Sequence, residues 1–157
     1  MVHRALGSIN GGYTLLEILV AVAVVGILAA QAMGAYDRYK ERVRVSQAVM
    51  DISMMSVIIT AYVTDNGTGP PDLAGVGMQA KLDPWGNPYE YMNLLDVKGK
   101  GSSRKDKKLN PLNSDFDLYS KGKDGDSKLP LSPKVSQDDV IRARDGRFVG
   151  LAADFDP

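Results

Sequence analysis

The feature that most constrains this chain is an apolar block near its N-terminus, running from Tyr13 to Met33. Only three of its 21 residues, Thr14, Glu17 and Gln31, carry polar side chains. A helix needs roughly 20 apolar residues to cross the hydrocarbon core of a bilayer. The block is therefore just long enough for one membrane span, and nothing later in the sequence resembles it.

A cleaved secretory signal peptide is the alternative interpretation of this block. Such a peptide has a shorter apolar core and ends at a small-residue cleavage site, which Ala29-Ala30-Gln31-Ala32 would supply. However, a charged residue lies inside the block, and the helical pattern continues beyond it, where a signal peptide would give way to a loop. The sequence therefore favours an uncleaved span.

The residues after the span continue with helical periodicity. Apolar side chains recur at spacings of three and four between polar ones, at Val45, Ala48, Val49, Ile52, Met55, Ile59 and Tyr62. This pattern predicts one apolar stripe that packs on a core. Gly67 supplies a left-handed cap and Pro70-Pro71 prevents continuation, so the helix should end at Asp65-Asn66-Gly67. We expect one helix of about fifty residues, or roughly 75 Å.

After Gly67 the composition shifts to Gly, Pro, Asp and Asn, with short β-type runs at 89–92, 116–119 and 148–151. We expect these runs to form a small antiparallel sheet. The predicted fold class is α+β, in which a long N-terminal helix, transmembrane in its first half, packs on the sheet. A chain of 157 residues with 44% hydrophobic content is near the usual size of one domain, which excludes two large domains.

Charge gives no reason to expect a nucleic-acid partner. The 19 Lys and Arg residues offset the 19 Asp and Glu residues, so the chain has no global field that attracts polyanions. Six basic residues gather between the first two β-type runs: Lys98, Lys100, Arg104, Lys105, Lys107 and Lys108. We expect a solvated, mobile hairpin loop here. An anion-binding or DNA-binding patch is the alternative, but no aromatic residue is interleaved to stack on bases.

Glu17 is the most informative residue of the apolar block. A carboxylate near the start of a membrane helix is costly unless it is paired or stays near the headgroups. The block contains no Lys or Arg, so no residue of the span neutralises Glu17 within the subunit. A free amine would do so if the chain were cleaved just before Tyr13. The alternative is that Glu17 reaches the interface and is solvated.

The segment Gly12-Tyr13-Thr14-Leu15-Leu16-Glu17, followed by the apolar run 18–30, resembles the prepilin leader and helix of type IV pilins and type II secretion pseudopilins. The resemblance implies that a prepilin peptidase/methyltransferase cuts after Gly12 and methylates the amine of Tyr13. It also implies that Glu17 pairs with the terminal amine of a neighbouring subunit during assembly. That amine would be the partner that Glu17 lacks within its own span.

With this resemblance the chain divides into four parts. Residues 1–12 are the cleaved leader, 13–36 the transmembrane and filament-core helix, 37–66 its amphipathic continuation, and 67–157 a small β-rich periplasmic region. The resemblance implies a single-pass protein of the bacterial inner membrane that later enters a filament in the periplasm or at the cell surface. The implied partners are other copies of the chain, the peptidase, an inner-membrane assembly platform, minor pseudopilins and, before assembly, the membrane.

A second resemblance covers the globular half. Residues 82–91, which include Asp83-Pro84-Trp85-Gly86, are similar to the segment just before the first strand of the major pseudopilin of type II secretion. Physically, Pro84 fixes a turn, Gly86 relieves it and Trp85 can fold back as an apolar plug. The chain has no cysteine, which separates it from pilins that close their C-terminal region with a disulfide.

Residues 116–125 then resemble the strand and calcium loop of the same family. The resemblance implies a calcium ion held through Asp124, Asp138 and Asp139, since calcium takes several oxygen ligands. The spacing between the first and the other two is longer than the family pattern. The alternative is a polar β-turn over residues 122–126, with Asp138-Asp139 starting a short helix.

No catalytic constellation is evident in the sequence. His3 is the only histidine and would leave with the leader, so a mature chain could not form a histidine triad or a histidine-based metal site. The Gly-rich stretches lack the P-loop and dinucleotide-binding patterns. We therefore expect a structural subunit that polymerises into a type II secretion pseudopilus or a related filament. The alternative is a membrane-anchored periplasmic binding domain that does not polymerise and uses the basic loop as its ligand site.

Overall fold

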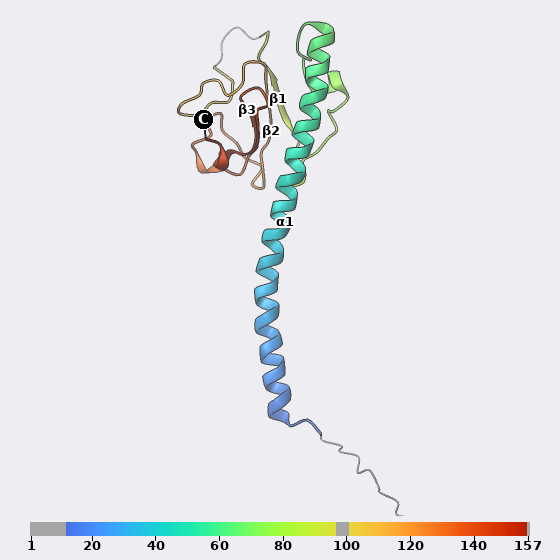
Figure 1. The fold of residues 1–157 in the computed structure, drawn as a ribbon, viewed down its shortest axis with the longest axis vertical. Helices are drawn as coiled ribbons and strands as arrows, with labels where there is room; N and C mark the ends of the chain where they lie inside the picture. Colours follow the sequence, from blue (N-terminus) through green and yellow to red (C-terminus); the bar gives the residue numbers. More distant parts are fainter. Residues whose placement is uncertain (1–11, 97–100, 157) are drawn as a thin grey trace, which may run out of the picture. The chain divides into compact units, whose positions relative to one another are not determined.

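The computed structural model describes residues 12–96 and 101–156, which form two compact units divided after Lys40. The predicted leader up to residue 11, and Lys98 and Lys100 of the basic loop, lie outside the described residues. One helix, α1 (Leu15–Asn66), contributes to both units and has 52 residues. The prediction of a single helix of about fifty residues is confirmed (Figure 1).

The first unit consists of the N-terminal part of α1 and the residues that lead into it. The backbone stays helical through Gly26 and Gly34, and every described residue up to Lys40 is exposed. By length and composition this part of the helix is able to cross a membrane. Since no described residue covers its apolar side chains, they need an apolar environment from outside the subunit.

In the second unit, the C-terminal part of α1 packs against the rest of the unit through the predicted stripe. The buried helix residues are Ala48, Ile52, Met55 and Ile59. The helix ends as predicted, because Gly67 has φ +74° and its N–H donates to the carbonyl of Val63 at 2.8 Å. The end of the helix is thus confirmed. The stripe is confirmed at six of its seven residues, because Val45 and Val49 also pack against the core, whereas at the end of the stripe Val63 packs there in place of Tyr62.

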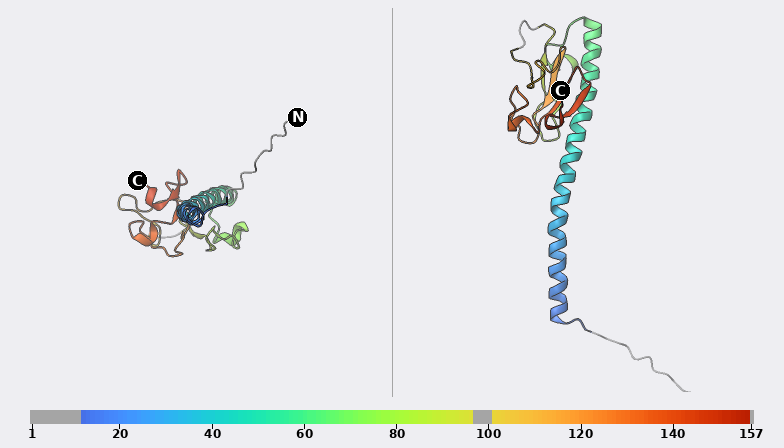
Figure 2. Two further views of the ribbon diagram at one scale, coloured as in Figure 1. Left: turned by 90° about the horizontal axis from the view of Figure 1, so that it is seen from below. Right: turned by 60° about the vertical axis from the view of Figure 1, so that its left-hand side comes forward.

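The sheet is an antiparallel meander in the order β1-β2-β3-β4, and the views in Figures 1 and 2 show it beside the C-terminal part of α1. The strands are β1 (Glu90–Asn93), β2 (Phe116–Ser120), β3 (Val140–Ala143) and β4 (Phe148–Leu151). Short 3-10 helices lie in the connections: η1 (Leu73–Val76), η2 (Lys134–Ser136) and η3 (Ala152–Asp154). The α+β fold with a small antiparallel sheet is confirmed.

Strand β3 is the element that the sequence did not predict. The interpretation of Asp138-Asp139 as the start of a short helix is wrong, because the next residues form β3, between β2 and β4. All four β3 residues are buried, so the strand lacks the alternation of apolar and polar residues that marks a half-exposed strand. An acidic pair before an apolar run is equally compatible with a helix start.

The two faces of the sheet are covered by different parts of the chain. One face packs on α1 through Phe116, Leu118 and Val140. On the other face Ile141 and Ala143 pack against Leu112, Leu131 and Ala152, which come from the connections and the C-terminal end. Part of the basic segment lies among the connections that cover this second face, and its residues Ser103 and Arg104 are buried there. The prediction of a solvated hairpin loop is therefore wrong at these two residues.

Candidate processing and assembly site

The predicted cleavage junction lies just before α1. Gly12 and Tyr13 precede the helix, and Tyr13 is 79% exposed. A Cβ added to Gly12 would meet no described atom within 4 Å. The fold of the described residues therefore does not itself require glycine at this position. Recognition of the junction by another protein would account for the glycine at position 12.

Thr14 and Glu17 form a reciprocal cap at the start of α1. The backbone N–H of Glu17 donates to Thr14 Oγ1 at 3.2 Å, and the backbone N–H of Thr14 donates to Glu17 Oε2 at 3.4 Å. This arrangement is a capping box, in which side chains accept from backbone N–H groups at the helix start; the N–H of Glu17 also donates to the Thr14 carbonyl at 3.1 Å. The Thr-x-x-Glu spacing in the sequence is the signal from which this cap is predictable.

The cap provides Glu17 with hydrogen bonds but not with a counter-charge. Within the described ranges no Lys or Arg forms an ion pair with Glu17. The positive end of the helix dipole favours a carboxylate at this position, yet it is only a partial charge. Full neutralisation in an apolar environment still requires a cation from outside these residues.

The Asp-Pro-Trp-Gly segment forms a turn that joins three parts of the second unit. Asp83 Oδ1 accepts hydrogen bonds from the backbone N–H groups of Trp85 and Asn87, at 3.0 and 2.8 Å, and its Oδ2 accepts one from the Ser120 hydroxyl at 2.5 Å. Trp85 packs against the main core, and its Nε1 donates to Glu41 Oε1 on α1 at 3.0 Å. The predicted turn and apolar plug are present, together with polar links that the sequence did not reveal.

Two of the predicted calcium ligands are bonded to the backbone of their own loop. Asp138 Oδ2 accepts from the backbone N–H groups of Lys123 and Asp124, at 2.9 and 3.1 Å. Asp124 Oδ1 accepts from the backbone N–H two residues further on, at 2.9 Å. Residues 122–125 form a turn in which Gly122 has φ +66°. Each carboxylate thus stabilises the turn directly.

Asp139, the third predicted ligand, is buried and paired with an arginine. Its Oδ2 lies 2.6 Å from Arg104 Nη2 and accepts a hydrogen bond from the Ser127 hydroxyl at 2.6 Å. Burial raises the pKa of Asp139 to about 6, while the Arg104 charge and the Ser127 hydrogen bond act in the opposite direction. Arg104 is a residue that sequence reasoning missed, because a run of basic residues ordinarily indicates a solvated surface.

The three predicted ligands are therefore engaged separately. The described part of the chain contains no group of three His, Cys, Asp or Glu side chains arranged to hold a metal ion. The one buried carboxylate oxygen there without a hydrogen-bond partner is Asp139 Oδ1, whereas calcium takes about six to eight oxygen ligands. In this arrangement the three residues do not fit a shared calcium ion.

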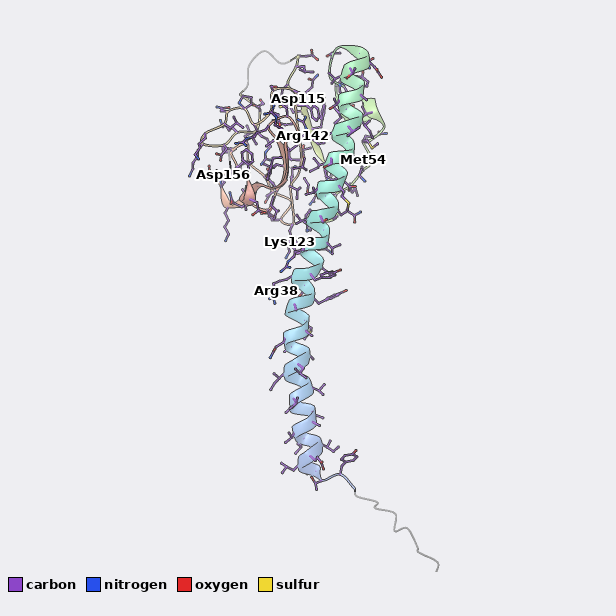
Figure 3. The ribbon with its side chains drawn as sticks, viewed as in Figure 1. Arg38, Met54, Asp115, Lys123, Arg142 and Asp156 are labelled. Atoms are coloured by element: carbon purple, nitrogen blue, oxygen red, sulfur yellow. The ribbon has the colours of Figure 1, made fainter. Side chains whose placement is uncertain are left out.

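A second buried guanidinium, that of Arg142, lies on the α1-facing side of the sheet. Its two Nη atoms contact the two carboxylate oxygens of Asp115, each at 2.7 Å, and Figure 3 labels both residues. The guanidinium carbon lies 3.9 Å from the Phe116 ring centroid. Burial by itself raises the pKa of Asp115. Hydrogen bonds from Arg142 and from the backbone N–H of Phe116 outweigh burial and hold that pKa below its usual value.

Known proteins resemble this chain both at the predicted processing junction and over most of its length. A family profile described as "Prokaryotic N-terminal methylation motif" matches residues 8–30. The fimbrial protein of Neisseria meningitidis serogroup A is 27% identical over 152 residues, which cover 94% of this chain and 88% of the relative. The type IV major pilin protein PilE of Neisseria gonorrhoeae is 27% identical over 147 residues, covering 88% and 85%.

A secretion protein is also among the relatives. The type II secretion system core protein G of Pseudomonas aeruginosa is 30% identical over 137 residues, covering 74% of this chain and 85% of the relative. No solved structure matches the chain significantly. The relatives therefore include subunits of both pili and a secretion system.

Proposed function

The chain belongs to the type IV pilin and type II secretion pseudopilin family, and on this premise we propose that it polymerises into a type II secretion pseudopilus or a related type IV pilus-like filament. Its role is structural rather than catalytic. The second unit forms the outer part of the filament, and the N-terminal part of α1 supplies the contacts that hold subunits together.

The observation that carries this proposal is the complete exposure of an apolar helix. Between Leu15 and Met33 the helix presents large apolar side chains that no described residue covers. A bilayer covers such side chains before assembly, and the same helices of neighbouring subunits cover them in a filament. Dispersion contacts and the close approach allowed by Gly26 and the alanines of the segment then replace contacts with acyl chains.

Maturation prepares the helix for this exchange. A prepilin peptidase/methyltransferase removes residues 1–12 and methylates the new amine at Tyr13. The exposed junction and the open space around Gly12 suit recognition by such an enzyme. The amine of one subunit is then the cation that neutralises Glu17 of its neighbour, for which the described residues offer no counter-charge.

The proposal places the protein in the bacterial inner membrane before assembly, with the second unit in the periplasm. An inner-membrane assembly platform extracts the subunit, and minor pseudopilins begin the filament. The Asp-Pro-Trp-Gly turn and the relative from the type II secretion system support the pseudopilus. The fimbrial relatives support a pilus.

Electron microscopy tests the proposal against a membrane-anchored binding domain that does not polymerise. Cells that overproduce the chain together with a type II secretion assembly system are sheared, and the released material is negatively stained. Filaments that bind an antibody against the second unit are the expected result. If the chain is processed and membrane-bound but releases no filaments under these conditions, while the system's own major pseudopilin does, the proposal is wrong.

A further inference from the structure

The Arg104 guanidinium occupies a buried position among polar groups from several segments. Its side chain is 3% exposed and that of Asp139 is 0% exposed. Besides the contact to Asp139, Arg104 Nη1 donates to Ser127 Oγ at 2.6 Å, and the guanidinium carbon lies 4.1 Å from the centroid of the Tyr119 ring. One side chain thus contacts β2, the residue before β3 and the connection between them.

The backbone of Arg104 is held as firmly as its side chain. Its N–H donates to Asp117 Oδ2 on β2 at 2.7 Å, and its carbonyl accepts from the N–H of Leu112 at 2.9 Å. The next residue, Lys105, exchanges backbone hydrogen bonds with Leu129 and Leu131, at 3.1 and 3.0 Å. The Arg104 backbone is therefore joined to β2, its side chain to Ser127, and the backbone of Lys105 to the connection at residues 129–131.

We infer that Arg104 is an internal cation that fixes this region, in the place where the family resemblance predicts calcium. The inference concerns the second unit alone and does not rest on the proposed filament. Asp139 is the predicted ligand that lies deepest, and its charge is neutralised by Arg104. Asp138 and Asp124, for their part, bind backbone N–H groups of the turn. The second unit then folds without a divalent cation.

The chemistry of arginine suits this role. A guanidinium is always charged, carries several N–H donors in a planar fork and stacks on aromatic rings. It therefore contacts Asp139 Oδ2, Ser127 Oγ and the Tyr119 ring at once, as a single ammonium group would not. A buried carboxylate that loses its only counter-charge is strongly destabilising, so the second unit should depend on Arg104.

Thermal unfolding of the full chain in detergent tests the inference. Trp85 is the only tryptophan and packs against the core of the second unit, so its fluorescence reports on that unit. The parent protein is melted in about 10 mM calcium chloride, roughly ten times the dissociation constant of the weakest extracellular sites, in the same concentration of magnesium chloride, and in EGTA. We expect the three melting temperatures to coincide.

Variants test whether Arg104 is the residue that stabilises the second unit. Arg104→Met keeps an apolar stem of similar length but leaves Asp139 without its counter-charge, and we expect the melting temperature to fall by roughly 10 °C or more. Lys107→Met removes an exposed positive charge from the same segment and should have little effect. Arg104→Met combined with Asp139→Asn removes both charges and should recover part of the loss.

Two results would overturn the inference. One is a parent melting temperature that is higher in calcium than in both magnesium and EGTA. The other is an Arg104→Met protein that melts like Lys107→Met. If Arg104→Met does not fold, Arg104→Lys takes its place. Lysine keeps the positive charge but lacks the planar set of N–H donors of a guanidinium. The Arg104→Lys protein should therefore melt at a lower temperature than the parent, and its melting temperature should not depend on calcium.

Discussion

Thr14 and Glu17 exchange two hydrogen bonds at the start of α1, one in each direction between side chain and backbone. Both residues lie after the predicted cleavage junction, so the cap survives maturation. A cap needs only a hydrogen-bond acceptor at position 17, whereas pairing with an amine needs a negative charge. The two roles of Glu17 therefore respond differently to substitution.

Glu17→Gln should abolish filament assembly while leaving the helix cap intact. Glutamine serves in a capping box as glutamate does, but it carries no charge to attract the amine of a neighbouring subunit. Filaments recovered by shearing, divided by the amount of processed subunit in the membrane, measure the effect, and we expect a drop of at least about tenfold, equivalent to roughly 1.4 kcal/mol.

Thr14→Ala is the matched control, because it removes the hydroxyl of the cap and leaves the charge. It should weaken the helix start by about 1 kcal/mol and still assemble. If Glu17→Gln assembles like the parent while Thr14→Ala does not, the cap matters and the charge pairing is excluded.

Gly12→Val should block processing. The described residues leave open space around Gly12, so valine disturbs no contact there and acts only through the peptidase. Intact mass of the membrane-extracted protein should show residues 1–12 retained, whereas the parent should begin at N-methylated Tyr13. Gly26→Val is the control, since a Cβ added there would also meet no described atom within 4 Å apart from the neighbouring backbone of its own helix. Normal cleavage of Gly12→Val would contradict the predicted junction.

Gly122→Ala should destabilise the second unit by roughly 3 to 5 kcal/mol, because it combines left-handed strain with a steric clash. An added Cβ would lie 2.2 Å from the carbonyl oxygen of Asp138, at φ +66°. Gly77→Ala has φ +73° but no described neighbour within 4 Å, so it isolates the strain, about 1 to 2 kcal/mol. Urea unfolding followed by Trp85 fluorescence measures both. Equal losses would show that the clash is relieved.

Asp115→Asn should lower stability at neutral pH by at least about 2 kcal/mol, because Arg142 stays buried without its ion-pair partner. The pKa of Asp115 is lowered in the folded state, so between its folded and unfolded pKa values the unfolded state binds more protons. The stability that Asp115 contributes is thus present above its unfolded pKa and lost as pH falls through the folded one.

Unfolding of parent and variant between neutral pH and strongly acidic pH checks this dependence. The difference between the two proteins should shrink only at the acidic end. Asp154→Asn, which alters an exposed carboxylate, is the control and should show little difference at any pH. A parent-variant difference that stays constant down to the lowest pH would contradict the ion-pair interpretation.

Local patterns in the sequence determined the helix and its C-terminal end. The apolar block and the stripe after it have a period that depends on the backbone of one helix alone. The stop at Gly67 depends on the conformational freedom of one residue. Three of the four strands were likewise predicted from short runs of β-type residues. The predictions for the processing junction and for Glu17 likewise rest on contiguous residues, through their resemblance to a known family.

Only the tertiary structure decided two features of the second unit, the pairing of Arg104 with Asp139 and the formation of strand β3. Arg104 and Asp139 are 35 residues apart in the sequence, and their pairing needs β2, β3 and the connection at residue 127 to be in place first. A basic run does not show which of its members is buried, because burial depends on a partner elsewhere in the chain. Strand β3 was not predicted for a similar reason. It is buried on both faces, by α1 on one side and by connections distant in the sequence on the other.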